Sequence, residues 1–256
     1  MGMHGDRVEG GMVTDDPLHA EGSDALGQVP EAIRHPPWLL IGAGAVAAGI
    51  LLLGLVGFFI DHGLQLSFDR AVLLTMRHGT MHGTPIGPAW LKLAMIDITA
   101  LGGATVLPVI VVITAGFLAV RRLWLTMWLV LGGTITGSIA IGLVKTLVAR
   151  ARPELTDHLV QVTSASFPSG HAANSAIVYL TIATLIVQIV EGRGTRMYIL
   201  AVTALLVTLI GVSRLYLGVH WPSDVIAGWS FGTLWALAWW SLGAWLRLKR
   251  AGSKGI

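Results

Sequence analysis

Two histidines and an aspartate stand in short polar segments of an otherwise apolar sequence. His171 ends the tetrapeptide "PSGH", and His220 and Asp224 belong to "SRLYLGVHWPSD" at residues 213–224. If the turn after His220 is helical, a carboxylate four residues later lies near its ring. A carboxylate on one ring nitrogen fixes the tautomer and leaves the other nitrogen free to act as a nucleophile. The spacing favours His220 as the nucleophile oriented by Asp224, with His171 as the acid that protonates a leaving group.

Three basic residues in and near these segments predict a site for a dianionic phosphate. Lys145 and Arg152 lie in "KTLVARARP", and Arg214 precedes His220 by six residues. Guanidinium groups can offer paired donors to phosphate oxygens, and lysine adds a movable point charge. Ser169 and Gly170 lie where an apolar segment begins. The free backbone N–H groups at the start of a helix favour an oxyanion there.

The composition indicates that these residues are positioned by membrane helices. Of the 256 residues, 54% are hydrophobic and only 12% are charged, which is typical of an integral membrane protein. The formal net charge is +3, but the basic residues are scattered between apolar segments. They are interpreted as topology signals, and no binding to nucleic acid is predicted. The absence of cysteine excludes disulfides and thiolate catalysis.

Apolar segments of about 20 residues, the length that crosses a hydrocarbon core, occur six times. They are residues 38–60, 94–120, 123–147, 171–190, 197–214 and 224–246. The segment 61–92 is too polar and too broken by glycine and proline to span, and it is expected to form an amphipathic interfacial helix and a turn. Gly133 and Gly137 are interpreted as helix-packing positions. The predicted fold class is all-α, a six-helix transmembrane bundle with an interfacial helix in the first outer loop.

The domain organisation follows from the same pattern. Residues 1–36 are expected to form a flexible polar N-terminal tail, 37–247 the transmembrane domain and 248–256 a short basic C-terminal tail. The first apolar segment is expected to remain as an uncleaved helix. An even number of spans places both termini on one side. The pair Arg121–Arg122 and the C-terminal "RLKRAGSK" then indicate that this side is cytoplasmic.

The predicted topology brings the chemically interesting residues to one face of the membrane. Lys145 ends the third span, His171 begins the fourth and Arg214 ends the fifth. His220 and Asp224 stand at the start of the sixth. Ionisable residues at membrane depth tend to mark functional sites. The expected site therefore faces the periplasm or the exterior of a cell (inner) membrane.

The three motifs, written K-x6-RP, PSGH and SR-x5-H-x3-D, occur in the order typical of one enzyme family. The chain resembles the type 2 phosphatidic acid phosphatase superfamily, in particular its six-helix bacterial lipid phosphatases, over about residues 38–246. The resemblance implies a phosphohistidine at His220, oriented by Asp224, with His171 as the acid. It also implies no metal ion and no cofactor. This agrees with the sequence, because three fixed cations can supply the charge stabilisation that Mg²⁺ supplies elsewhere.

The predicted activity is hydrolysis of a lipid phosphate monoester or pyrophosphate in the membrane. Candidate substrates from the resemblance are undecaprenyl pyrophosphate, phosphatidylglycerol phosphate, phosphatidic acid and diacylglycerol pyrophosphate, with carrier-lipid recycling at the outer leaflet as the leading hypothesis. Transfer of the phosphoryl group to another hydroxyl is the alternative use of the site. Six spans disfavour a soluble vanadate haloperoxidase, and the complete motifs disfavour a transporter or scaffold. The oligomeric state is open.

Other polar side chains near the motifs receive simpler interpretations. Asp97 is expected to pair with a neighbouring cation. Tyr216 and Trp221 are expected to anchor the chain at the membrane interface or to line a lipid tail. No metal site is predicted from the histidines of the first outer loop, which lack regular ligand spacing: His62, His78 and His82.

Overall fold

A computed structural model describes residues 37–62, 67–79 and 83–252. Within these residues the secondary structure is helical, apart from one isolated bridge between Arg77 and Pro85. The helices are α2 (Trp38–Asp61), α3 (Ser67–Thr75), α4 (Ala89–Ala100), α5 (Val106–Val120), α6 (Trp124–Val148), α7 (Gly170–Ser175), α8 (Thr181–Ile186), α9 (Arg193–Tyr216) and α10 (Pro222–Gly252). A π-helical segment, Ala176–Leu180, joins α7 to α8. The all-α prediction is confirmed.

The predicted tails lie mostly outside the described residues. Residues 1–36 and 253–256 are not described, so the expected flexibility of the N-terminal tail is not tested. The C-terminal boundary predicted at residue 247 falls inside α10, which continues to Gly252.

Helix length supports part of the predicted membrane topology. Among the described residues, α2, α6, α9 and α10 are long and apolar enough to cross a membrane. Two further apolar helices are shorter, namely Val106–Val120 and Gly170–Ile186. At 1.5 Å per residue, the 15 residues of α5 reach about 22 Å, less than the ~30 Å of a hydrocarbon core. The structure therefore shows four helices of spanning length, and the count of six is not confirmed.

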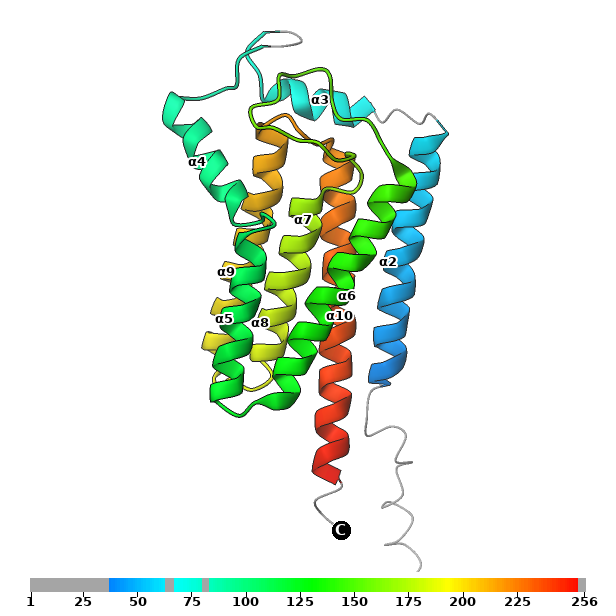
Figure 1. Ribbon diagram of the computed structural model, residues 1–256, viewed down its shortest axis with the longest axis vertical. Coiled ribbons are helices and arrows are strands. Elements are labelled where there is room, and N and C mark those ends of the chain that lie inside the picture. Colours follow the sequence, from blue (N-terminus) through cyan, green and yellow to red (C-terminus); the bar gives the residue numbers. More distant parts are fainter. Residues whose placement is uncertain (1–36, 63–66, 80–82, 253–256) are drawn as a thin grey trace, which may run out of the picture. The chain divides into compact units, whose positions relative to one another are not determined.

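The predicted second span, 94–120, is wrong as a single helix. The chain turns over residues 101–105, between α4 and α5. Gly102 and Gly103 are poor helix formers and lie in this turn. Gly102 packs so closely against the neighbouring helices that a Cβ atom there would lie 2.5 Å from Ile210 Cγ2 and 3.3 Å from the carbonyl oxygen of His171. The break lets the chain pack against α7 and α9, and α4 runs obliquely to α5 while it still contacts α9 (Figure 1).

Helix α10 occupies the centre of the bundle and contacts α2, α6, α7, α8 and α9 (Figure 1). Its contact with α7 is close because glycine faces small residues. A Cβ at Gly232 would lie 2.5 Å from Ala176 Cβ, and a Cβ at Gly228 would lie 3.0 Å from Ala173 N. This approach brings the first turns of α7 and α10 side by side, so that the N–H of Ser169 donates to the carbonyl oxygen of Asp224 at 3.1 Å.

The glycines predicted as packing positions in α6 serve that purpose. Gly133 is buried, and its carbonyl oxygen accepts a hydrogen bond from Trp235 Nε1 at 2.8 Å. A Cβ at Gly137 would lie 2.8 Å from Ile177 Cγ2 and from Trp235 Nε1. Both glycines therefore let α6 approach its neighbours closely, and the prediction is confirmed.

The segment predicted to lie outside the spans forms α3 and the turn that follows. In Figure 1, α3 lies crosswise over one end of the bundle, the same end at which α6 and α9 finish and α7 and α10 begin. Asp69 and Leu73 are its buried residues. A charged side chain buried beneath a short helix is unusual unless it is paired. Its partners lie at the site described next.

Candidate active site

Helices α6 and α9 end, and α7 and α10 begin, at the end of the bundle that α3 covers, and these helix ends and their loops carry the predicted site residues (Figure 1). Lys145 and Arg214 lie in the last turns of α6 and α9, and Asp224 lies in the first turn of α10. Arg152 belongs to the loop between α6 and α7, and His220 to the short connection between α9 and α10. Helix ends that meet in this way can bring residues from distant parts of the sequence into one cluster.

His220 and Asp224 form a buried pair. The side chains are 2% and 0% exposed, and His220 Nδ1 lies 3.5 Å from Asp224 Oδ2. The local sequence explains the geometry, because Pro222 begins α10, where a proline is favoured. Asp224, two residues later, accepts the backbone N–H of Trp221 at 3.0 Å with the same Oδ2. The fixed carboxylate therefore faces the histidine ring, as the i,i+4 spacing predicts.

The other ring nitrogen of His220 faces Arg152. Arg152 Nη1 lies 3.3 Å from His220 Nε2, and the guanidinium is fixed by bonds to the carbonyl oxygens of Val219 (2.6 Å) and Ser164 (2.8 Å). A guanidinium can only donate. We therefore assign the proton to Nδ1, facing Asp224, and the lone pair to Nε2, facing Arg152. This is the tautomer that a nucleophilic Nε2 requires.

The surroundings keep His220 neutral. Burial lowers the pKa of His220 from 6.5 to about 4, and the charges of Arg214 and Arg152 act in the same direction against the opposing effect of Asp224. An imidazole with this pKa has a free lone pair throughout the neutral range.

The remaining predicted cations lie beside the histidine. Lys145 Nζ donates to the carbonyl oxygens of Ala165 (2.6 Å) and Pro168 (3.2 Å). Arg214 is 3% exposed and donates through Nη1 to Thr99 Oγ1 at 2.9 Å. Its Nε is buried and finds no hydrogen-bond partner in the described part of the chain. A buried donor without a partner suits the binding of an anionic oxygen.

His171 belongs to the same cluster. It is the second residue of α7 and is half-buried. The charges that act on its ring are those of Arg214, His220, Lys145 and Arg152, all residues predicted for the site. Its backbone and Cβ lie against Gly102, in the break between α4 and α5. The second histidine is therefore held close to the first.

Ser169 stabilises the fold around the site. Its side chain is the N-cap of α7 and accepts the N–H of Ala172 at 3.5 Å. Its own N–H is engaged by the carbonyl of Asp224, so this group is not free for an oxyanion as predicted. Gly170 faces Lys145, since a Cβ there would lie 4.0 Å from Lys145 Cε. A small residue leaves space for the lysine chain at this position.

Comparison with known proteins identifies the family. The model of the PAP2 superfamily matches residues 126–247, which include all three motifs. Phosphatidylglycerophosphatase B of Bacillus subtilis is 40% identical over 151 residues, covering 57% of this chain and 71% of the relative. The chain belongs to the PAP2 superfamily. Its membership makes it a membrane lipid phosphatase, a hydrolase that acts on phosphate esters or pyrophosphate.

Other similar proteins are named for different lipid substrates. Decaprenylphosphoryl-5-phosphoribose phosphatase of Mycobacterium tuberculosis is 34% identical over 167 residues, covering 64% of this chain and 77% of the relative. The crystal structure of a transmembrane PAP2 phosphatidylglycerolphosphate phosphatase from Bacillus subtilis is similar with a TM-score of 0.65 and 28% identity, covering 82% of this chain and 97% of that chain. Aquifex aeolicus LpxE, with a TM-score of 0.53 and 23% identity over 68% of this chain and 96% of its own, shares the fold.

Several polar residues of the site were not predicted from the sequence. Arg150 and Ser166 bind the carboxylate of Asp224, and Thr99 binds Arg214. Arg150 lies two residues before Arg152 in the same basic motif, which is a signal that sequence analysis could have used. Thr99 carries no such signal, because its position depends on the break after α4.

The simpler interpretations have mixed outcomes. Tyr216 is 5% exposed and donates to the carbonyl oxygen of Ile86 at 2.9 Å, so it packs inside the protein. Trp221 is bonded to the carbonyl oxygen of Ala151 at 3.1 Å, and its ring lies 5.3 Å from the guanidinium carbon of Arg150. The side chain of Asp97 is exposed. Within the described residues, which omit His82, no cluster of three metal-binding side chains occurs.

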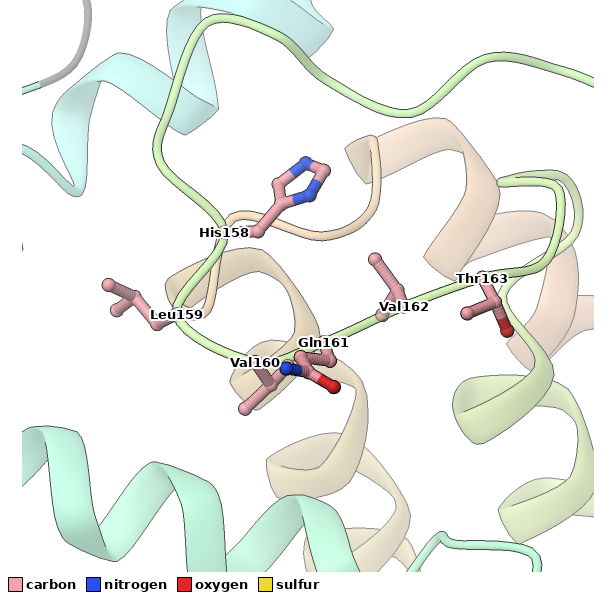
Figure 2. Close-up of a pocket in the computed structure, with 6 residues that line it drawn as sticks. All are labelled: His158, Leu159, Val160, Gln161, Val162 and Thr163. Carbon is pink, nitrogen blue, oxygen red and sulfur yellow. The ribbon is translucent and has the colours of Figure 1, made fainter.

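The loop that carries Arg152 also forms a surface pocket of about 530 Å³ (Figure 2). Its lining is a single stretch of the loop, from His158 to Thr163, and this stretch leads to Ser164, which fixes Arg152. His158 Nε2 lies 2.9 Å from the carbonyl oxygen of Pro153. These contacts tie the pocket wall to the segment that holds the arginine.

Proposed function

We propose that the protein removes a phosphate group from a membrane lipid through a phosphohistidine formed at His220. The observation that carries this proposal is the buried His220 ring, which lies between the carboxylate of Asp224 and the guanidinium of Arg152. Nε2 thereby faces a group of cations and can attack a bound phosphoryl group. The family membership supports the same reaction class.

In the first step, His220 Nε2 attacks phosphorus and the bond from phosphorus to the leaving oxygen breaks. His171 donates a proton to this oxygen, because the dianionic phosphate favours a proton on a neighbouring imidazole. The imidazole becomes cationic when the N–P bond forms, and the carboxylate of Asp224 stabilises the proton on Nδ1. Lys145, Arg152 and Arg214 bind the three transferring oxygens.

In the second step, His171 accepts a proton from water as the water oxygen attacks phosphorus. The N–P bond breaks, inorganic phosphate is released, and Nε2 regains its lone pair. Attack by a lipid or sugar hydroxyl at this stage would transfer the phosphoryl group instead, which is the second candidate function. The two are distinguished by adding an acceptor alcohol and measuring whether phosphate release falls as a new phosphate ester forms.

We further propose that the site opens on the non-cytoplasmic side of the membrane. Helix α2 begins, and helix α10 ends, at the end of the bundle opposite the motifs (Figure 1). Basic residues gather at that end, including Arg121, Arg122 and the last turn of α10 with Lys249 and Arg250. Such residues favour the cytoplasm. With the two shorter apolar helices counted, the chain would cross six times.

The proposed substrate class is a lipid phosphate monoester or pyrophosphate of the outer leaflet, with undecaprenyl pyrophosphate as the leading candidate. Relatives named for phosphatidylglycerophosphate, decaprenylphosphoryl-5-phosphoribose and undecaprenyl diphosphate support a site that accepts either glycerol or prenyl lipids. Phosphatidylglycerol phosphate and phosphatidic acid are the other candidate substrates, and their rates of phosphate release should be compared with that of undecaprenyl pyrophosphate.

The test is phosphate release by the purified full-length protein in detergent, with undecaprenyl pyrophosphate, phosphatidylglycerol phosphate and phosphatidic acid as substrates. The proposal expects release from at least one lipid, no loss of activity in excess EDTA, and trapping of a phosphohistidine that is absent from His220→Ala. Release that required added Mg²⁺, or an active His220→Ala variant, would overturn the mechanism. Absence of release from all three lipids would overturn the substrate class.

A further inference from the structure

A buried ion network connects α3 to the catalytic carboxylate. Arg150, in the loop after α6, donates through Nη1 to Asp224 Oδ1 at 2.5 Å and through Nη2 to Asp69 Oδ2 at 3.0 Å. The three side chains are 11%, 0% and 3% exposed. One guanidinium therefore bridges two buried carboxylates from different parts of the chain, in the fork geometry that arginine provides.

Asp69 also holds the beginning of α10. It accepts the backbone N–H of Ser223 at 2.8 Å with Oδ1 and the Ser223 hydroxyl at 2.6 Å with Oδ2. Arg150 Nη1 completes the arrangement by donating to Ser223 Oγ at 2.8 Å. An acidic side chain is favourable near a helix N-terminus, where backbone N–H groups are free. The contacts of Asp69 therefore fix the turn that carries Asp224.

The two oxygens of Asp224 have separate partners. Oδ1 accepts from Arg150, while Oδ2 accepts from Ser166 Oγ (2.5 Å) and the N–H of Trp221 (3.0 Å) and faces His220 Nδ1 (3.5 Å). Rotation of the carboxylate away from His220 would break the bond to Arg150. The orientation of Asp224 is thus set from the side opposite the histidine.

We propose that Arg150 and Asp69 are positioning residues for the nucleophile, with Arg150 setting the orientation and charge of Asp224 and Asp69 holding Arg150 and the start of α10. The inference rests on the proposed function, in which Asp224 orients His220. It assigns to α3, which lies outside the three motifs, a part in the reaction.

The charges predict opposite effects for the two residues. Two carboxylates and one guanidinium leave one negative charge in the network. Loss of the Arg150 charge makes Asp224 a stronger partner for a protonated ring, so it should raise the His220 pKa. Loss of the negative charge of Asp69 should not raise the His220 pKa, because it leaves the network less negative. The other charged or titratable groups that act on His220 are Arg152, His171 and Arg214, and Lys145 acts on His171 and Asp224.

The experiment measures the His220 pKa by NMR of the full-length protein in detergent with ¹⁵N-labelled histidine, and His220→Gln assigns the resonance. Arg150→Gln should raise this pKa and lower kcat by about 100-fold, as expected for a misplaced reacting group, with little change in KM. Asp69→Asn should lower kcat less and should not raise the pKa. Exposed residues of the same types provide matched controls, Arg121→Gln and Asp97→Asn.

Arg150→Gln leaves two buried carboxylates without a counter-charge and can fail to fold. Arg150→Lys keeps the charge but cannot bridge both carboxylates, so its kcat should fall between those of Arg150→Gln and the wild type. The inference is overturned if Arg150→Lys and Asp69→Asn match the controls in both kcat and His220 pKa. Failure of the proposed reaction would appear as a wild-type protein that is inactive or that needs a metal ion. The NMR titration needs no substrate, so it tests the roles of Arg150 and Asp69 independently of that reaction.

Discussion

Arginines pack between helices at both ends of the bundle, Arg247 half-buried at one end and Arg214 buried at the other, and their surroundings differ. At the end opposite the motifs, Arg247 of α10 donates to Gln188 Oε1 and to Thr126 Oγ1, and Gln188 Nε2 donates to the carbonyl oxygen of Trp240. These partners are neutral and complete a set of hydrogen bonds between helices. At the motif end, Arg214 keeps a buried Nε without a partner in the described residues and lies near a second guanidinium, that of Arg152.

The difference separates a structural contact from a binding site. Neutral acceptors offset the desolvation of Arg247 and join α6 to α10. The hydrogen-bond donors of Arg247 therefore have partners within the protein, and no ligand is needed. Arg214 and Arg152 repel one another, and Arg214 Nε is buried without a partner in the described residues, and both features cost stability. An anion would remove both penalties. The repulsion between these two arginines and the unpartnered Nε of Arg214 therefore support the phosphate proposed to bind there.

The largest effect should come from removing the nucleophile. His220→Ala should lower kcat by more than about 10³-fold, since loss of a catalytic nucleophile leaves only binding and electrostatic stabilisation. Phosphate release from the preferred lipid provides the measurement. Gln188→Ala, at the other end, serves as the control and should keep activity near the wild-type level. Equal losses for the two variants would contradict the contrast between the ends.

Labelling should separate the two ends in an intact cell. The chain has no native cysteine, so Glu154→Cys in the motif-end loop and Ala251→Cys near the end of α10 can each carry one exposed thiol. An impermeant maleimide should label Glu154→Cys from outside and Ala251→Cys only after the membrane is opened. The reverse pattern would place the site in the cytoplasm. Labelling of both from outside would require an even number of crossings between residues 154 and 251, in place of the three proposed here.

Matched arginine-to-lysine changes should sharpen the comparison further. Arg214→Lys should lower kcat/KM by about 10²-fold, because a point charge cannot replace a planar fork on a transferring phosphoryl group. Arg247→Lys should leave kcat/KM unchanged and reduce the free energy of unfolding by about 1 kcal/mol through lost hydrogen bonds. Kinetics and thermal unfolding of both variants provide the check. A comparable kinetic loss in Arg247→Lys would show that the far end is coupled to catalysis.

The smallest effect is a displaced pH profile. Burial lowers the pKa of His220 to about 4, so the free enzyme keeps an unprotonated nucleophile until the pH falls near that value. The acid limb of kcat/KM should then lie near pH 4, below the 6.5 of an exposed histidine. The measurement is kcat/KM of the full-length protein from about pH 3.5 to about pH 8. A limb at the ordinary histidine value would mean that the nucleophile is more exposed than the structure shows.

Sequence reasoning identified the residues that meet at the candidate site because the motifs are local and each places its residues at or near the end of a helix. His220 lies just before α10, and Asp224 in the first turn of that helix reaches back toward it, so their contact needs no tertiary information. Asp69 and Thr99 depend instead on how α3 and α4 pack across the bundle, which no local pattern reports. The break at Gly102 was missed because glycines in an apolar stretch also suit membrane helices, and only the contact with Ile210 shows why this one turns.

The close contact between α7 and α10 has a mechanical consequence. Gly228 and Gly232 allow the two helices to approach until the N–H of Ser169 reaches the carbonyl oxygen of Asp224. His171, the proposed acid, lies in the first turn of α7, and Asp224, which is proposed to orient the nucleophile, lies in the first turn of α10. The distance between two helix axes is thus part of the geometry of the proposed reaction. A bulkier residue at Gly228 or Gly232 would separate the helices and with them the two side chains.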